Sequence, residues 1–132
     1  MRQKQYRKTL TPSVFYILLA LSDKERHGYE IMKQAEYDSC GKIEMGPGTL
    51  YGNIKRMLAD GLIEEAYERP DAEFDDERRK YYRLTGLGRK QLSMELERYN
   101  NVIKLARRKN LLSGIELPHA TKRPLPPVPI PI

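Results

Sequence analysis

The chain has 132 residues and a formal net charge of +6, with 39% hydrophobic and 32% charged residues. That length suits one small domain with a modest core and short appendages. The longest apolar run, Val14 to Leu21, is far too short to span a bilayer, which excludes a transmembrane protein. The N-terminus lacks the apolar stretch and cleavage site of a secretory signal, and the single Cys40 cannot form an intramolecular disulfide. We therefore expect a cytoplasmic protein.

Charged residues gather in blocks along the chain. Residues 1–10 form a basic arm, and an acidic stretch at 71–77 directly precedes a second basic block, which is Arg78, Arg79 and Lys80. Each block on its own is as consistent with a solvated surface as with a binding surface. The position of each block in the fold has to decide between the two.

The first helix is expected to begin at Thr11-Pro12, because Thr is a good N-cap and Pro loses nothing at the first helical position. Its apolar side chains cover more than one face, so it has surface to spare for a second subunit. A polar turn at 22–25 should end it. A second helix is then predicted from about His27-Gly28 to before Gly41, with Tyr29, Met32 and Ala35 facing inward.

A third helix is predicted after the break at 45–48. Its helical spacing turns four apolar residues toward the core, namely Leu50, Ile54, Met57 and Leu58. Small, aromatic and basic residues are left facing outward, namely Thr49, Tyr51, Gly52, Lys55 and Arg56. Such a face suits a helix that enters the major groove of DNA, because cationic side chains at a helix start can reach phosphates and base edges. An ordinary solvated helix face has the same pattern.

Two short strands are predicted at 62–68 and 78–84, joined by the acidic loop. Three helices followed by a two-stranded hairpin form a winged helix-turn-helix, in which the hairpin reaches the DNA backbone or minor groove. Arg78, Arg79 and Lys80 lie nearest the tip of this wing and are the expected phosphate contacts. The predicted fold class is therefore mainly α with a small β-hairpin.

A long helix is expected from Thr85, a good N-cap, to about Leu112. Its apolar residues follow a 4-3-4-3 spacing, which keeps one seam in line for a partner helix, and they are Leu92, Leu96, Tyr99, Ile103 and Ala106. We therefore expect a homodimer in which this seam packs with Val14 and Leu18 of the first helix. Packing within a single chain is the alternative.

The chain is thus expected to have four parts, which are a basic arm at 1–10, a winged-helix domain at 11–84, a dimerisation helix at 85–113 and a Pro-rich tail at 114–132. Six of the nine prolines lie in the last fifteen residues, which predicts an extended, polyproline-like chain. The tail is either a disordered appendage or a segment that docks on a partner protein or on a groove of the dimer.

Five short segments occur in the order and spacing of a known family. They are His27-Gly28-Tyr29-Glu30-Ile31, Gly48-Thr49-Leu50-Tyr51, Lys55-Arg56-Met57, Asp60-Gly61-Leu62-Ile63, and Arg79-Lys80-Tyr81-Tyr82-Arg83-Leu84-Thr85 with Gly88. Together they cover about residues 10–110 and resemble the PadR family of bacterial transcriptional regulators. The short C-terminal part is similar to the subfamily with a single dimerisation helix. The family's usual Pro is replaced here by Gly52.

This resemblance implies a dimeric repressor that binds a roughly palindromic operator and releases it on binding a small hydrophobic or aromatic molecule. It implies DNA contacts from Thr49, Tyr51 and Lys55 and from the wing residues Arg79 and Lys80. It also implies that Tyr99 lines an effector cavity at the dimer interface, with Phe15 nearby. Both rings could equally well fill the dimer core.

No catalytic or metal chemistry is expected. His27 and His119 are too few and too far apart for a zinc site, and His27 is better placed to cap a helix or join the core. The glycines at 46–48 lack the Lys-Ser/Thr of a nucleotide-binding loop. We therefore expect no cofactor and no enzyme. The competing hypothesis is a winged-helix module that binds another protein through the acidic loop and the Pro-rich tail.

Overall fold

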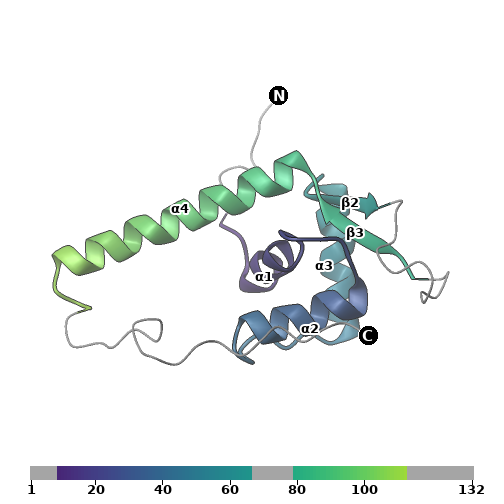
Figure 1. The fold of residues 1–132 in the computed structure, drawn as a ribbon, viewed down its shortest axis with the longest axis horizontal. Helices are drawn as coiled ribbons and strands as arrows, with labels where there is room; N and C mark the ends of the chain where they lie inside the picture. The colour runs from purple at the N-terminus through teal and green to yellow at the C-terminus, as the bar shows by residue number, and fades with distance from the viewer. Residues whose placement is uncertain (1–8, 67–78, 113–132) are drawn as a thin grey trace.

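In the computed structural model, the described part of the chain comprises residues 9–66 and 79–112. Its elements, in chain order, are α1 (Pro12–Ala20), β1 (Arg26–His27), α2 (Gly28–Asp38), α3 (Pro47–Ala59), β2 (Ile63–Ala66), β3 (Tyr81–Leu84) and α4 (Gly86–Arg108) (Figure 1). The mainly helical fold class is confirmed. The basic arm at 1–8, the acidic loop with Arg78, and the Pro-rich tail lie outside the described residues.

The sheet has three antiparallel strands in the order β1-β3-β2. Arg26 of β1 pairs with Tyr82 of β3, and Ile63 of β2 pairs with Leu84. The predicted two-stranded hairpin is present as β2 and β3. The third strand, β1, was not predicted, because its two residues are too few to produce an alternating pattern. Its addition places the start of α2 directly beside β3.

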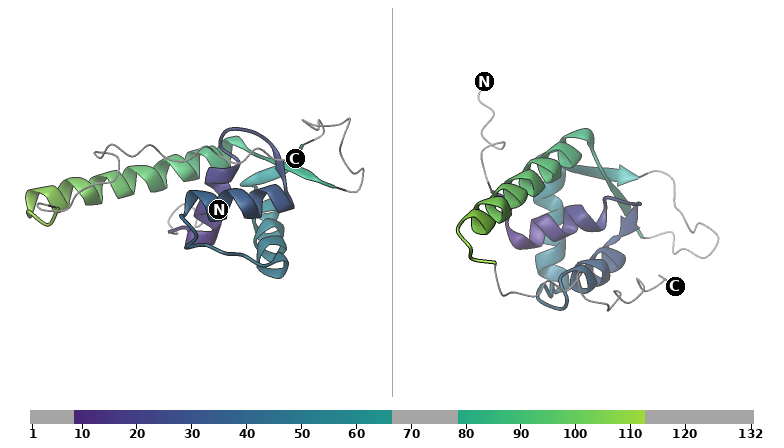
Figure 2. Two further views of the ribbon diagram at one scale, coloured as in Figure 1. Left: turned by 60° about the horizontal axis from the view of Figure 1, so that its bottom comes forward. Right: turned by 60° about the vertical axis from the view of Figure 1, so that its left-hand side comes forward.

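The core forms around α1, which contacts α2, α3 and α4 (Figure 2). Ile17 and Leu18 of α1 pack there with Ile31, Leu50 and Ile54. Leu18 is 0% exposed and Leu92 is 5% exposed, so both belong to the core of the single chain and offer almost no surface to a second subunit. These two residues are therefore removed from the expected dimer interface.

The inward face of α2 differs from the prediction. Tyr29 is 57% exposed, whereas Ile31 and Ala35 are buried. The helix begins at Gly28, so Tyr29 occupies its first turn. Of the three residues predicted to face inward, Ala35 is buried and Met32 is partly buried against the core, so only Tyr29 differs.

Helix ends follow the capping rules. The Thr11 hydroxyl accepts from the Val14 N–H at 3.2 Å, and Pro12 occupies the first helical position, as predicted. The end of α4 differs, because the helix stops at Arg108 and not near Leu112. Asn110 has a φ of 62°, and the Leu111 N–H donates to the Ala106 carbonyl at 2.9 Å. This left-handed cap terminates the helix.

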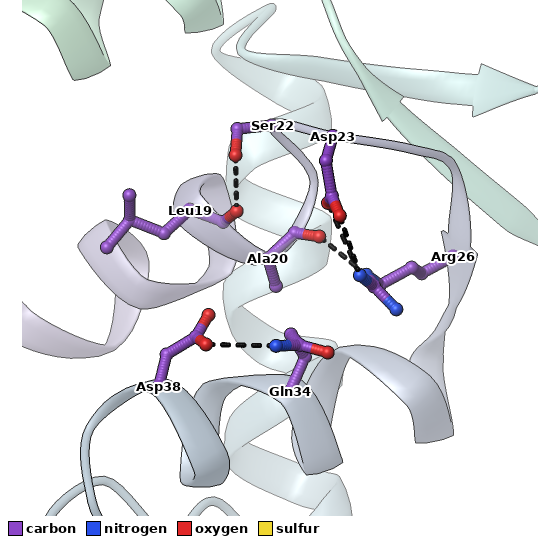
Figure 3. A network of polar contacts seen from close by, with 7 residues as sticks. All are labelled: Leu19, Ala20, Ser22, Asp23, Arg26, Gln34 and Asp38. Carbon is purple, nitrogen blue, oxygen red and sulfur yellow. Dashed lines mark hydrogen bonds and ion pairs between the residues drawn. The ribbon is translucent and has the colours of Figure 1, made fainter. Parts of the chain in front are cut away.

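A buried arginine holds the turn between α1 and β1 (Figure 3). Arg26 is only 4% exposed, and its Nε donates to the Ala20 carbonyl at 2.7 Å. Its Nη2 also donates to the Asp23 carboxylate at 3.2 Å. The guanidinium therefore donates to a carbonyl at the end of α1 that no helical N–H reaches. This contact fixes where β1 begins.

Four residues join α3 to the long helix α4. They are Gly61, Leu62, Thr85 and Gly88, and we call them the α3–α4 junction. The Thr85 hydroxyl donates to the Gly61 carbonyl at 2.6 Å and accepts from the Gly88 N–H at 3.0 Å. The Thr85 N–H donates to the Leu62 carbonyl at 3.1 Å. A Cβ at Gly88 would overlap the Leu62 carbonyl oxygen. Only glycine, which has no Cβ, allows these two backbone segments to lie so close together.

Replacing Gly88 with Ala should therefore destabilise the fold. The methyl group has to displace backbone, so we expect the free energy of unfolding to fall by about 1–3 kcal/mol, as measured by urea denaturation. Gly52→Ala is the matched control, since a Cβ there meets nothing within 4 Å. That variant should gain up to about 1 kcal/mol, because Ala is the better helix former. Equal stability of the two variants would contradict the close approach.

Candidate nucleic-acid interface

The outer face of α3 has the arrangement that the sequence predicted. Leu50, Ile54 and Met57 are buried, whereas the residues on the other side of the helix are exposed, namely Thr49, Tyr51, Lys55 and Arg56. The Arg56 Nη2 donates to the Asn53 Oδ1 at 2.6 Å, which ties this guanidinium to its own helix. Lys55 forms no ion pair with any described residue, so its charge is available to a ligand.

The base of the wing brings further cations to the same side as the start of α2. Arg79 and Lys80 are exposed and directly precede β3. The Lys80 Nζ lies 3.5 Å from the Glu65 carboxylate, and the Arg79 Nη1 lies 3.2 Å from the His27 Nε2. Two of the three basic residues predicted as phosphate contacts, Arg79 and Lys80, are therefore present at this surface. Arg78, the third, lies outside the described residues.

His27 caps α2, which is one of the two roles expected from the sequence. The Glu30 N–H donates to the His27 Nδ1 at 3.3 Å, and the His27 N–H donates to the Glu30 carboxylate at 3.2 Å. This reciprocal capping box fixes the first turn of α2. The Tyr81 ring stacks edge-on against the His27 imidazole with the centroids 5.2 Å apart, which joins the cap to β3.

A cleft of about 420 Å³ lies between α3 and the base of the wing. The start of α2, Tyr51 of α3, the wing-base cations and β3 line it, through His27, Gly28, Tyr29, Tyr51, Arg79, Lys80 and Tyr82. Tyr51, Arg79 and Lys80 were predicted as DNA contacts. Tyr82 and the start of α2 were not among the predicted DNA contacts. The signal that could have found them is Gly28, a poor helix former placed in the first turn.

The Tyr82 hydroxyl is held in its neutral form. Burial raises the pKa of Tyr82 above its ordinary value, and the nearby Glu65 carboxylate and Tyr51 raise this pKa further. Tyr82 therefore remains a hydrogen-bond donor throughout the neutral pH range.

Phe15 and Tyr99, the expected effector residues, are brought together where α1 meets α4. Their ring centroids are 5.2 Å apart in an edge-on arrangement. Arg98 lies over the Tyr99 ring at 5.0 Å and donates to the Glu95 carboxylate at 3.0 Å. This hydrogen bond lowers the pKa of Glu95, against the opposing effect of burial. Tyr99 keeps 37% of its surface exposed, so the pair is open on one side.

The far part of α4 carries several uncovered apolar side chains. The helix extends beyond the body formed by α1, α2 and α3 (Figures 1 and 2). Six of the nine exposed large hydrophobic side chains of the described residues lie on it, namely Met94, Leu96, Tyr99, Val102, Ile103 and Leu105. Val14 of α1 is half-buried, and so is Ala106. Of the predicted dimer contacts, Leu96, Tyr99 and Ile103 thus have the most free surface.

Within the described ranges, no helix combines the length and apolarity needed to cross a membrane. The same residues contain no group of three or more His, Cys, Asp or Glu side chains that could hold a metal ion.

Three short helices, a small antiparallel sheet and an exposed basic helix face define a winged-helix regulator of transcription. The model of the transcriptional regulator PadR-like family matches residues 17–94. The chain belongs to this family, whose members are transcription regulators and not enzymes.

Individual relatives agree with this assignment. An uncharacterised protein from Lysinibacillus sphaericus is 34% identical over 77 residues, which is 58% of this chain and 68% of the relative. A PadR family transcription regulator from Clostridium difficile is 28% identical with a TM-score of 0.60, over 74% of this chain and 97% of that one. A PadR-like transcriptional regulator from Bacillus cereus is 27% identical, also with a TM-score of 0.60, over 76% and 91%.

Proposed function

We propose that the protein is a homodimeric repressor that binds an inverted-repeat operator and releases it when a small hydrophobic or aromatic effector binds. The observation that carries the DNA-binding part is the exposed outer face of α3, which lies beside the cations at the base of the wing. Repression is supported by the resemblance to PadR regulators. The competing protein-binding hypothesis depends on the acidic loop and the tail, which lie outside the described residues.

DNA binding would use two elements. The outer face of α3 would enter the major groove through Thr49, Tyr51, Lys55 and Arg56, because a helix start with small and cationic side chains can approach the bases closely. Arg79 and Lys80 would contact the phosphate backbone beside it, together with Arg78. Contacts to base edges select sequence, whereas contacts to phosphates set affinity and register. Lys55 and Tyr51 would also reach phosphates at the edge of the groove.

Lys55→Ala and Arg79→Ala should each weaken operator binding and make its salt dependence shallower. Every phosphate contact releases counterions, so the slope of log K against log salt should decrease in magnitude by about 1 for each lost contact. Titrations at several salt concentrations measure both quantities.

Lys90→Ala is the matched control, since Lys90 is an exposed cation of α4 that belongs neither to the outer face of α3 nor to the base of the wing. It should leave the slope unchanged. If Lys55→Ala and Arg79→Ala also kept the wild-type affinity and slope, the assigned face would be wrong.

Dimerisation would use the apolar face of α4. A monomeric protein seldom leaves a contiguous apolar strip of this kind in water. Leu96, Tyr99 and Ile103 recur at the 3-4 spacing of a helix that packs along a partner helix. The 23 residues of α4 extend over about 34 Å, so two such helices can bury a substantial area between them. The half-buried Val14 would contribute from α1.

Ile103→Glu should convert the dimer to a monomer at micromolar concentrations, because a carboxylate would lose its hydration inside an apolar interface. Sedimentation equilibrium measures the change. Asn101→Glu introduces the same charge on the opposite side of the helix, two residues or about 200° away, and should remain dimeric. A monomeric wild-type protein, or a dimeric Ile103→Glu variant, would contradict the proposed interface.

Effector binding would involve the aromatic pair of Phe15 and Tyr99. The support for this is their edge-on contact and the partly open Tyr99 ring, beside the apolar face of α4. A flat apolar molecule inserted there would contact α1 and α4 together. It could thereby alter the angle between the two recognition helices of a dimer.

Tyr99→Leu separates this role from simple packing. Leucine keeps the apolar bulk that a dimer contact needs but removes the aromatic ring, so the variant should still dimerise and bind DNA. A screen of planar aromatic compounds for release of the operator should find compounds that act on the wild type and at least tenfold less on this variant. Compounds that released both proteins equally, or a screen that released neither, would overturn the proposed effector site.

A further inference from the structure

The start of α2 leaves two backbone donors without a helical partner. The first four N–H groups of any α-helix lack intrahelical acceptors. In α2, the capping box occupies the N–H groups of His27 and Glu30. The N–H groups of Gly28 and Tyr29 donate to no described residue, and both residues line the cleft. The positive end of the helix dipole adds to the preference for an anion at this point.

A buried hydroxyl points independently to a polar ligand. Tyr82 is 5% exposed and lines the cleft, and its hydroxyl forms no hydrogen bond with any described residue. Tyr51 lines the same cleft, and it contributes to the raised pKa of Tyr82. A buried hydroxyl with no partner among the described residues is costly to leave unpaired, so an acceptor bound in the cleft would stabilise it. Because it stays protonated, it can donate to that acceptor.

The third feature is the close approach of Tyr51 to Gly28. A Cβ at Gly28 would overlap the Tyr51 hydroxyl, so the missing side chain lets Tyr51 of α3 extend over the start of α2. The recognition helix therefore contributes a hydroxyl to the same cleft. Arg79 and Lys80 complete it with positive charge. The exposed ion pair between Lys80 and Glu65 is too weak to neutralise that charge.

We propose that this cleft binds one phosphate group of the DNA backbone. The donors would be the N–H groups of Gly28 and Tyr29, the hydroxyls of Tyr51 and Tyr82, and the cationic side chains of the wing base. The inference rests on the proposed DNA-binding function. A backbone phosphate is the anion that fits, because the cleft lies between the two elements proposed to contact DNA. A phosphate fixed there would set how α3 is rotated in the groove.

A scan with neutral methylphosphonate linkages tests this assignment. Each phosphate of an operator half-site is replaced in turn, and the affinity of the intact protein is measured. At one position, neutralisation should reduce the affinity of the wild type about tenfold, the size expected when hydrogen bonds to a charged group are lost. In the Tyr82→Phe variant, neutralising the same phosphate should reduce the affinity about threefold or less, because the variant has already lost part of its interaction with that phosphate.

Tyr81→Phe is the matched control, since Tyr81 is the neighbouring buried tyrosine of β3 and does not line the cleft. Its scan should equal that of the wild type. Identical scans for Tyr82→Phe and the wild type would overturn the phosphate site while leaving the proposed function intact. A wild type that binds no operator would overturn the proposed function, and this site with it.

Gly28→Ala separates binding from folding. Alanine is the better helix former, and the only atoms it displaces belong to the end of the Tyr51 side chain. We therefore expect a melting temperature equal to that of the wild type or higher, together with about a tenfold loss of operator affinity. Wild-type affinity in a folded Gly28→Ala protein would contradict the arrangement of the cleft.

Discussion

The close approach of α4 to the end of α3 is the constraint on which the rest of the structure depends. At the α3–α4 junction, the Gly88 backbone lies against the Leu62 carbonyl, and Thr85 bonds to both Gly61 and Leu62. Four chain segments meet there, since α3 ends, β2 begins, β3 ends and α4 begins within a few residues. The helix proposed to bind DNA is thereby rigidly connected to the helix proposed to bind a second subunit. In a dimer, this connection would set the separation of the two recognition helices.

A second set of contacts joins the recognition helix to the wing. Tyr51 extends from α3 over Gly28 of α2, and His27 contacts both Tyr81 and Arg79. The short strand β1 makes this possible, because it places the start of α2 next to β3. Acidic side chains on the sheet are matched by neighbouring cations, as in the pair of Arg83 and Glu64 at 2.9 Å.

Local rules predicted most of the fold. The helical spacing of α3, the Thr11 and Thr85 caps and the left-handed Gly61 at the end of α3 all follow from interactions within a few residues. The missed features depend on contacts between distant segments. The strand β1 exists only because β3 lies beside it, and Leu18 and Leu92 are buried because α1 sits at the centre of the helices. The candidate site also depends on contacts between distant segments. The sequence pattern predicted Tyr51 and Lys80 as site residues but could not place Tyr82 near the start of α2.

The central claim is that two α3 helices, held apart by a pair of α4 helices, bind one operator. Hydroxyl-radical footprinting on the DNA upstream of the gene tests it most directly. A dimer of winged-helix domains should protect two half-sites of an inverted repeat, with centres separated by about one helical turn or a whole number of turns. A single protected half-site, or two in direct-repeat orientation, would contradict the account.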